Sequence, residues 1–308
     1  STYQILDNKT QIQIFGRLEN GQSFVALKDF TPYFFIEEHN LNKASLLLAK
    51  YKTEKTALTN FKGKKVIKIF SETPTELNKL VVALHKKGVS TYEADLKPAT
   101  RFIIDNDLLG IINIEGDYET SERVDRVYKE PEIKPISSEE HRPKLKIISL
   151  DIESDEKFNE LFCIGLYGEN YKKIFIISKQ EVPDAVSCKD EPELLQKFKE
   201  EIIKIDPDII TGYHVIDFDL AYLKEKFVKY KIPFDIGRTN ENVRIKIESD
   251  FFRNSTVYIP GRQVLDALNL IRDPFIKEEP FIKNIKFESY TLENVSQQIL
   301  GEGKILKG

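Results

Sequence analysis

The alternation of apolar and polar residues predicts strands throughout the first 70 residues of the chain. Apolar and polar residues alternate around two turn-like stretches, "DNK" and "ENG", in "YQILDNKTQIQIFGRLENGQSFVAL", as they do in antiparallel strands joined by tight turns. A further strand is predicted for "KKVIKIF", and the apolar spacing of "LNKASLLLAKY" is that of a helix. This part of the chain is therefore expected to be rich in β-structure.

Two helices are predicted in the part that follows. The first lies in "TPTELNKLVVALHKKG". It begins at Thr73 or Thr75 and ends at Gly88, because glycine suits the left-handed position after a helix. Its apolar residues at helical spacing are Leu77, Leu80, Val81 and Leu84. A strand and a short helix beginning near Pro98 are predicted for "VSTYEADLKPATRFIIDNDLLG".

Residues 117 to about 144 are polar, contain three prolines and show no sustained period. Such a composition indicates a linker or a surface excursion between domains. We therefore expect two domains, a β-rich domain over residues 1–143 and a second domain over residues 144–308. The whole chain is expected to have an α/β (α+β) fold.

The second domain begins with the buried-strand pattern "LKIISLDIES". Two more strands, "LFCIGLYG" and "KKIFIIS", are predicted to form a hairpin beside it. They are followed by a helix in "EPELLQKFKEEIIKI", a short strand in "PDIITGY", another helix in "DFDLAYLKEKFVKY" and a last helix in "SYTLENVSQQILGEGKILKG". This order predicts an RNase H-like domain, in which helices flank a mixed sheet.

Composition excludes several classes of protein. Hydrophobic residues make up 41% and charged residues 31% of the 308 residues, as in folded rather than disordered proteins. No apolar run approaches the about 20 residues that cross a membrane, and the N-terminus has no signal-peptide pattern. Two cysteines, Cys163 and Cys188, are too few for a disulfide framework or a zinc cluster and favour a cytoplasmic setting. The net charge of −4 means that any binding of DNA would depend on a local basic surface.

The segment "SLDIES" carries two acids at the end of an apolar strand. Asp151 and Glu153 are two residues apart, so their side chains point to the same face of the strand. Two adjacent carboxylates disfavour ionisation unless a cation neutralises them, and hard divalent cations such as Mg²⁺ prefer carboxylate oxygens. Taken alone, the pair has a simpler explanation, which is that the strand ends here with both acids in solvent.

A third acid, Asp219, lies in the first turn of a predicted helix in "GYHVIDFDLAYL". The helix dipole stabilises an acid there, and Asp217 could cap the helix. However, Phe218, Tyr213 and His214 surround the acid in sequence, and aromatic rings beside an acid suit a site that stacks an unpaired base. Together the three acids favour phosphodiester hydrolysis with two metal ions.

A run of lysines follows this segment. Its members could follow a phosphate backbone, although a solvated helix face is the more common meaning of such a run. They are Lys224, Lys226, Lys229 and Lys231.

The segments "SLDIES" and "GYHVIDFDLAYL" resemble the first two exonuclease motifs of family B DNA polymerases. Other blocks resemble the N-terminal and exonuclease domains of the family, its bacterial branch above all, in the same order: "GVSTYEADLKPATRFI", "LFCIGLYG", "DPDIITGY", "IPFDIGR", "GRQVLDAL" and "LENVSQQILGEGK". "FTPYFFIEE" is similar to the archaeal branch. Because these ordered blocks cover nearly the whole chain, we prefer the metal-site hypothesis to that of two solvated acids.

The resemblance implies a proofreading 3′→5′ exonuclease that uses two Mg²⁺ or Mn²⁺ ions. Asp151, Glu153 and Asp219 match the acids of the first two motifs, and are the expected catalytic and metal-binding residues. The expected DNA contacts are Phe218, Tyr213, His214, Leu150 and Ile152. The implied partners are the primer 3′ end and template strand of DNA, the rest of a polymerase chain and a sliding clamp. A nucleoid-associated location in the cytoplasm is implied as well.

Two features depart from the family's pattern. His214 stands where the family usually has asparagine. The third motif, Y-x-x-x-D, does not occur after Asp219, so we expect a part of a longer polymerase with weak or no exonuclease activity of its own. Asp266 in "GRQVLDAL" is a candidate for a further acid, with a structural role at a strand end as the preferred interpretation.

The first domain is expected to be a scaffold on the template side. In archaeal relatives the corresponding region holds a pocket that senses uracil in the template, and Pro32, Tyr33 and Gly88 are the residues that we assign to such a pocket. Two other functions stay open for the chain as a whole. One is a free-standing 3′→5′ exonuclease of the DEDD type, and the other is a non-catalytic module that binds DNA.

Overall fold

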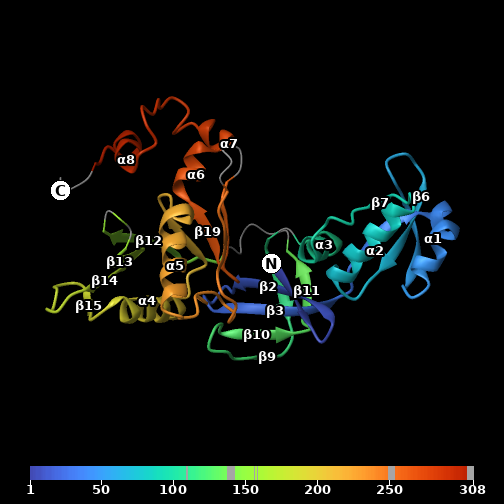
Figure 1. The fold of residues 1–308 in the computed structure, drawn as a ribbon, viewed down its shortest axis with the longest axis horizontal. Helices are drawn as coiled ribbons and strands as arrows, with labels where there is room; N and C mark the ends of the chain where they lie inside the picture. The colour runs from blue at the N-terminus through green and yellow to red at the C-terminus, as the bar shows by residue number, and fades with distance from the viewer. Residues whose placement is uncertain (109, 137–142, 156, 158, 249–253, 304–308) are drawn as a thin grey trace. The chain divides into compact units, whose positions relative to one another are not determined.

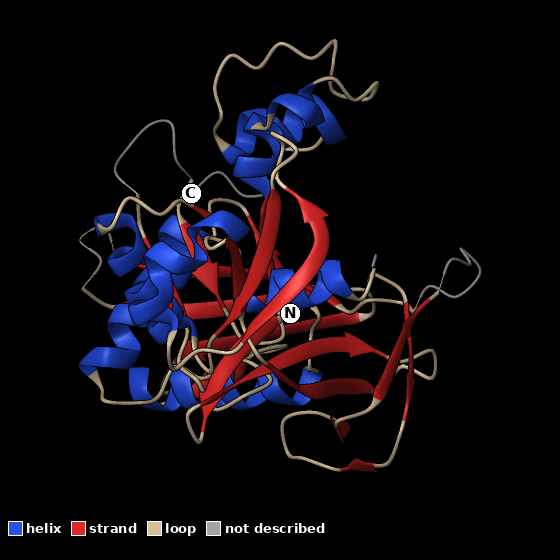
Figure 2. Cartoon of the chain, turned by 90° about the vertical axis from the view of Figure 1, so that its right-hand side faces the viewer, coloured by secondary structure: helices blue, strands red, loops and turns tan. Residues whose placement is uncertain are grey.

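The chain forms two compact units, Ser1–Lys144 and Leu145–Gly308, as Figure 1 shows by colour along the sequence. The division lies one residue from the boundary expected from the sequence. Both units contain strands and helices, which Figure 2 shows in red and blue for the chain as a whole. The computed structural model describes residues 1–108, 110–136, 143–155, 157, 159–248 and 254–303.

Unit 1 is rich in strands, as predicted. Its strands are β1 (Thr2–Leu6), β2 (Lys9–Arg17), β3 (Ser23–Phe30), β4 (Tyr33–Glu37), β5 (Thr53–Thr59), β6 (Lys65–Phe70), β7 (Thr91–Tyr92), β8 (Ile112–Glu115), β9 (Tyr118–Glu119), β10 (Arg126–Lys129) and β11 (Glu132–Pro135). Its helices are the 3₁₀ turn η1 (Glu38–Asn40), α1 (Leu41–Leu48), α2 (Pro74–Lys86) and α3 (Pro98–Asp105).

The polar segment after residue 117 is mostly part of unit 1, so its interpretation as a linker is wrong over residues 118–135. Strand β10 pairs in parallel with β3 and antiparallel with β9, in a sheet of order β1-β2-β3-β10-β9, and β11 pairs with β8. These strands are short and mostly half-buried or exposed, so they lack the apolar alternation by which a strand is recognised. Residues 137–142 of the expected linker lie outside the described residues.

A second sheet of unit 1 has the order β5-β6-β4-β7 and is antiparallel throughout. Successive side chains of β4 point to opposite faces of this sheet. Phe34 and Ile36 are fully buried and pack in the core beneath α1 and α2, whereas Tyr33 and Phe35 pack with other rings on the opposite face. Helix α2 begins where it was predicted, because the Thr73 hydroxyl accepts a hydrogen bond from the Glu76 amide at 3.3 Å.

Unit 2 contains one mixed sheet of order β15-β14-β13-β12-β16-β19. The strands of unit 2 are β12 (Ile147–Ser154), β13 (Leu161–Gly168), β14 (Tyr171–Ile177), β15 (Val186–Cys188), β16 (Ile209–Gly212), β17 (Arg244–Lys246), β18 (Thr256–Tyr258) and β19 (Gln263–Asp266). Its helices are α4 (Glu191–Ile205), the π-helical turn η2 (Ile216–Leu220), α5 (Ala221–Lys229), α6 (Ala267–Arg272), α7 (Pro274–Lys277) and α8 (Leu292–Leu300).

The sheet of unit 2 has the mixed pairing predicted from the sequence, and helices flank it. Strands β12, β13 and β14 are antiparallel neighbours, while β16 is parallel to β12 and β19 is parallel to β16. Helices α4 and α5 meet through Phe198 and Phe227, whose ring centroids are 6.5 Å apart, and both rings are fully buried. This apolar contact packs α5, the helix that follows η2, against α4. Among the described residues, no helix has the length and apolar character needed to cross a membrane.

Candidate functional site

Strand β12 carries the first two acids on its open face. Ile148, Leu150 and Ile152 are 2–4% exposed in the core of unit 2, whereas Asp151 and Glu153 are exposed. The alternation predicted for this strand is therefore present. It also means that the side chains of Leu150 and Ile152 are covered by the core, which does not suit the DNA contacts expected for them.

The third acid reaches β12 through its backbone. Strand β16 pairs with β12 only as far as Ser149, so the edge of β12 beyond that residue has no parallel neighbour from β16. There the amide of Ile152 donates a hydrogen bond to Oδ1 of Asp219 at 3.0 Å. Asp219 thus takes the place of a strand partner at the residue between the other two acids.

Two glycines leave room around these groups. A Cβ on Gly212, at the end of β16, would lie 2.6 Å from the Leu150 carbonyl oxygen, so only glycine lets β16 approach β12 this closely. Gly165 of β13 is opposite Asp151 in the ladder, and no side chain there fills the space beside the acid. Glycine at position 165 therefore leaves the β13 side of Asp151 without a neighbouring side chain.

The electrostatics of Asp219 are unusual for an aspartate. The residue is 2% exposed, and burial raises the pKa of its carboxyl to about 7. The charge of Asp151 raises this pKa in the same direction, while the hydrogen bond from the Ile152 amide lowers it. A nearby cation would favour the charged form of the Asp219 carboxyl and so act against both effects.

The turn that carries Asp219 is built differently from the prediction. Asp217, which could have capped a helix, lies inside the π-helical turn η2, and no side chain caps that turn. Instead Asp266, which is 3% exposed, accepts hydrogen bonds from the amides of His214, Ile216 and Leu268 at 3.0–3.1 Å. Asp266 is therefore a positioning residue that holds the backbone leading to Asp219, and this bears out the structural role preferred for it.

The aromatic residues around the turn differ in their surroundings. His214 is exposed and has a φ of +61°, a left-handed conformation in which asparagine and histidine are enriched. This backbone conformation therefore suits the histidine of this chain as well as the asparagine of the family's pattern. Phe218 is half-buried and packs against the core of unit 2. The Tyr213 hydroxyl donates to the Tyr290 carbonyl at 2.7 Å, so it is already engaged within the protein.

The lysine run is not a uniform solvated face. Lys226 is 4% exposed, and its ammonium donates to Glu191 Oε1 and to the Asn159 carbonyl, both at 2.6 Å. Glu191 also accepts a hydrogen bond from the Leu161 amide at 2.6 Å. These contacts tie α4 and α5 to the segment that follows β12. Sequence reasoning missed them because the partners are far apart in the chain.

Within the described residues, no group of three or more His, Cys, Asp and Glu side chains has the arrangement of a metal site. This applies to the three predicted acids as well: Asp219 is bonded to the Ile152 amide of β12, and the carboxylates of Asp151 and Glu153 on either side of that residue are exposed.

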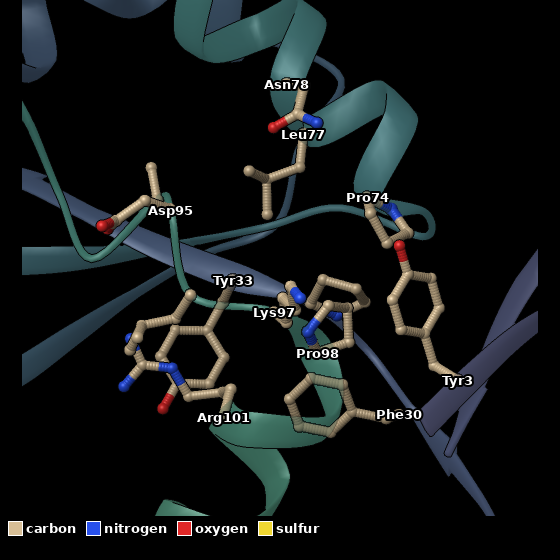
Figure 3. A pocket seen from close by; sticks show the side chains of 13 residues that line it. Tyr3, Phe30, Tyr33, Pro74, Leu77, Asn78, Asp95, Lys97, Pro98 and Arg101 are labelled. Atoms are coloured by element: carbon tan, nitrogen blue, oxygen red, sulfur yellow. The ribbon is translucent and has the colours of Figure 1, made fainter. Parts of the chain in front are cut away.

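Unit 1 contains a separate pocket of about 140 Å³ (Figure 3). Pro32 and Tyr33, two of the three residues assigned to a template-base pocket, line it, and Gly88 does not. Gly88 has a φ of +64° after α2, and its carbonyl accepts a hydrogen bond from the Lys43 ammonium at 3.1 Å. The guanidinium carbon of Arg101 lies 4.7 Å from the centroid of the Tyr33 ring.

Comparison with known proteins gives consistent matches along the whole chain. DNA polymerase II of Escherichia coli is 27% identical over 307 residues, and the match covers 96% of this chain and 37% of the relative. The DNA polymerase of Methanocaldococcus jannaschii is 27% identical, over 99% of this chain and 18% of the relative. A solved family B DNA polymerase from Pyrobaculum calidifontis has the same fold, with a TM-score of 0.73 and 20% identity, over 96% of this chain and 38% of that one.

These relatives are two and a half times as long as the chain or longer, since the chain spans 18–38% of them. The sequence model for the exonuclease domain of DNA polymerase family B matches residues 89–295, which is more than half of the chain. The family predicted from the sequence motifs is therefore confirmed: the chain belongs to family B of the DNA polymerases and corresponds to their N-terminal and exonuclease region.

Proposed function

We propose that unit 2 hydrolyses the terminal phosphodiester at the 3′ end of DNA, and that Asp151, Glu153 and Asp219 form its metal-binding site. The observation that carries the proposal is the hydrogen bond from the Ile152 amide to Asp219, which joins the third acid to the strand that bears the other two. Membership of a family with an exonuclease domain supports the same conclusion.

The residues fit Mg²⁺ or Mn²⁺ by their chemistry. All three supply carboxylate oxygens, which hard divalent cations prefer. Asp219 is a buried carboxyl with a raised pKa beside Asp151, and a cation would favour its charged form. When bound, a pair of such ions would supply a deprotonated water and stabilise the leaving oxygen.

The chain's own residues would orient the DNA strand for this reaction. The Ile152 amide bonds to the carboxylate of Asp219, and Asp266 holds the backbone that leads to it, so both contacts restrict the position of this carboxylate. Phe218 precedes Asp219 and packs against the core of unit 2, and an aromatic side chain at this position is the one that would stack against the terminal base. In a full-length polymerase this site would proofread the primer 3′ end, beside the template strand, the polymerase domains and a sliding clamp.

The direct test is degradation of a 5′-labelled single-stranded oligonucleotide in Mg²⁺ or Mn²⁺. We expect slow laddering from the 3′ end, because the family's third motif does not occur after Asp219 in this sequence. Asp151→Ala should abolish it, whereas Asp184→Asn, at an exposed acid elsewhere in unit 2, should not. Laddering that survives in Asp151→Ala would contradict the proposal.

The same assay separates the two other functions left open by the sequence. A free-standing exonuclease would degrade the oligonucleotide at a rate typical of an enzyme, about 1 s⁻¹ or faster. A non-catalytic module would bind the oligonucleotide equally well in wild type and Asp151→Ala, and neither would degrade it in any metal.

A second proposal concerns the pocket of unit 1, which we propose to take a single base of the template strand. Figure 3 shows Tyr33 and Arg101 on one side of it, Tyr3 on the other and Pro98 between them. Its volume of about 140 Å³ is below the roughly 300–1,000 Å³ of pockets for drug-sized ligands. Uracil is the base implied by the resemblance to archaeal relatives.

The proposal that this pocket binds a base can be tested by filling the pocket with a larger side chain. Ala94 lines the pocket and is half-buried, so Ala94→Leu should reduce its volume, and Ala57→Leu on exposed β5 is the matched control. We expect Ala94→Leu alone to remove any preference for a uracil-containing oligonucleotide over its thymine counterpart in anisotropy titrations. If wild type shows no such preference, base selection by this pocket is excluded.

A further inference from the structure

The hairpin between β5 and β6 presents a fully exposed aromatic ring. We call residues 58–65 the hairpin tip. Phe61 within it has a relative exposure of 111%, and Leu58 is 55% exposed. Leaving a phenylalanine side chain entirely in water forgoes the favourable burial that such a side chain usually finds in a folded protein, so the position needs another explanation.

The hairpin tip is held in one conformation by polar contacts. The Asn60 side-chain oxygen accepts hydrogen bonds from the amides of Lys62 and Lys64, both at 3.0 Å. The Asn60 side-chain amide donates to Glu37 Oε1 at 3.0 Å, and the Tyr92 hydroxyl donates to the same oxygen at 2.7 Å. Because these hydrogen bonds anchor the turn to the buried Glu37, Phe61 is exposed on a hydrogen-bonded turn of defined conformation.

The hairpin tip is also a local basic surface in a chain of net charge −4. Residues 55–70 contain five lysines and no acidic residue. Lys62 and Lys65 are exposed, and they form no ion pair with any residue that the structure describes. Lys64, in contrast, pairs with Glu37 at 3.2 Å as part of the anchor.

We propose that the hairpin tip is a binding site for single-stranded DNA, with a base stacked on Phe61 and phosphates held by Lys62 and Lys65. An exposed ring and exposed lysines in one turn combine the two features that recognise an unpaired strand without regard to its sequence. Preorganisation of the turn lowers the entropy lost on binding. The partner is DNA rather than an anionic membrane because the chain belongs to a family of DNA polymerases. The site lies in unit 1 and is independent of the metal site proposed above.

The absence of tryptophan from the sequence allows a direct test of stacking. Phe61→Trp would place the chain's single tryptophan on the hairpin tip. Titration with an oligothymidylate in EDTA, which prevents metal-dependent hydrolysis, should quench its fluorescence. The control is Leu46→Trp, at a position of unit 1 that is 84% exposed on α1, and its fluorescence should not change at the same DNA concentrations.

Affinity measurements separate the ring from the charges. By fluorescence anisotropy, Phe61→Ala should weaken binding of labelled oligothymidylate at least about fivefold, the low end expected for one stacked base. Lys62→Ala with Lys65→Ala should reduce the slope of log affinity against log salt by about 1.4, since each phosphate contact on a single strand contributes about 0.7. Lys86→Ala with Lys87→Ala, which removes the same charge at the end of α2, should leave this slope unchanged.

Three results would overturn the proposal. One is an unquenched Phe61→Trp at DNA concentrations that saturate the chain by anisotropy. The second is equal quenching of Leu46→Trp, which would show non-specific contact. In the third, Phe61→Trp fluorescence would shift to the blue on phosphatidylserine vesicles but not respond to DNA, which would assign the hairpin tip to a membrane surface.

Discussion

At the scale of single residues, the site depends on where a buried carboxyl is placed. Asp219 is 2% exposed and bonded to the Ile152 amide, next to the charge of Asp151. Such a group is unfavourable in the metal-free protein, because its charged form is desolvated and repelled. The charged Asp219 carboxyl should therefore lower the free energy of unfolding of the metal-free chain, and this effect can be measured.

Replacing Asp219 should stabilise the metal-free chain at high pH. The pKa of the carboxyl is about 7 in the folded chain against 3.8 as its ordinary value, so the folded state binds the proton more tightly. Stability then falls as the pH rises from about 4 to about 7, by up to roughly 4 kcal/mol. Asp219→Asn keeps an oxygen for the Ile152 amide and should lack this decrease, as measured by urea unfolding in EDTA at pH 5 and pH 8.

The control for this prediction is Asp184→Asn, which changes an exposed acid of unit 2. It should retain the wild-type dependence on pH. Parallel pH profiles for wild type and Asp219→Asn would show that Asp219 is not the destabilising group.

At the scale of elements, the close approach of β16 to β12 should depend on Gly212. A Cβ there would meet the Leu150 carbonyl at 2.6 Å, which is backbone and cannot rotate away. We expect Gly212→Ala to lower the free energy of unfolding by about 1–3 kcal/mol, in the range of overpacked cores, as measured by urea unfolding. Gly165→Ala is the matched comparison, because its nearest contact would be an ordinary 3.8 Å, and a similar loss in both variants would count against the geometric explanation.

The sequence predicted elements where one local pattern dominates. The strand that carries Asp151 and Glu153 and the helix capped by Thr73 could be predicted because their signals lie within a few residues. Strand β10 could not, because it is polar and gains its order by pairing with β3, about 100 residues away in the chain. The burial of Lys226 was missed for the same reason, since it depends on Glu191 in another helix. The three acids could be named from the sequence, but the hydrogen bond from the Ile152 amide to Asp219 could not be predicted, because a backbone amide has no sequence signal.

At the scale of the whole molecule, a buried ionic network should determine how unit 2 responds to acid. Asp206 pairs with Arg238 and Arg262, each at 2.8 Å. Its burial acts against the charged form, but the two guanidinium groups outweigh this and lower the pKa of the carboxyl below its ordinary 3.8. A lowered pKa contributes stability above the unfolded value, and this contribution is lost as the pH falls below about 4.

Asp206→Asn should therefore destabilise the chain at pH 7, by about 3–5 kcal/mol, because it leaves two buried guanidinium groups without this partner. The difference from wild type should shrink as the pH falls below about 4. Thermal unfolding followed by circular dichroism at pH 7 and pH 3 measures both effects. A difference that stays constant between these pH values would mean that the pKa of Asp206 is the same in the folded and the unfolded chain.

The central claim is that Asp151, Glu153 and Asp219 form a site for divalent cations, and its most direct test is Mn²⁺ binding followed by electron paramagnetic resonance. The wild-type chain should bind Mn²⁺, and Asp151→Asn and Asp219→Asn should each weaken binding at least about tenfold. Asp184→Asn should bind as wild type does. Mn²⁺ affinities that are the same in all four proteins would contradict the claim.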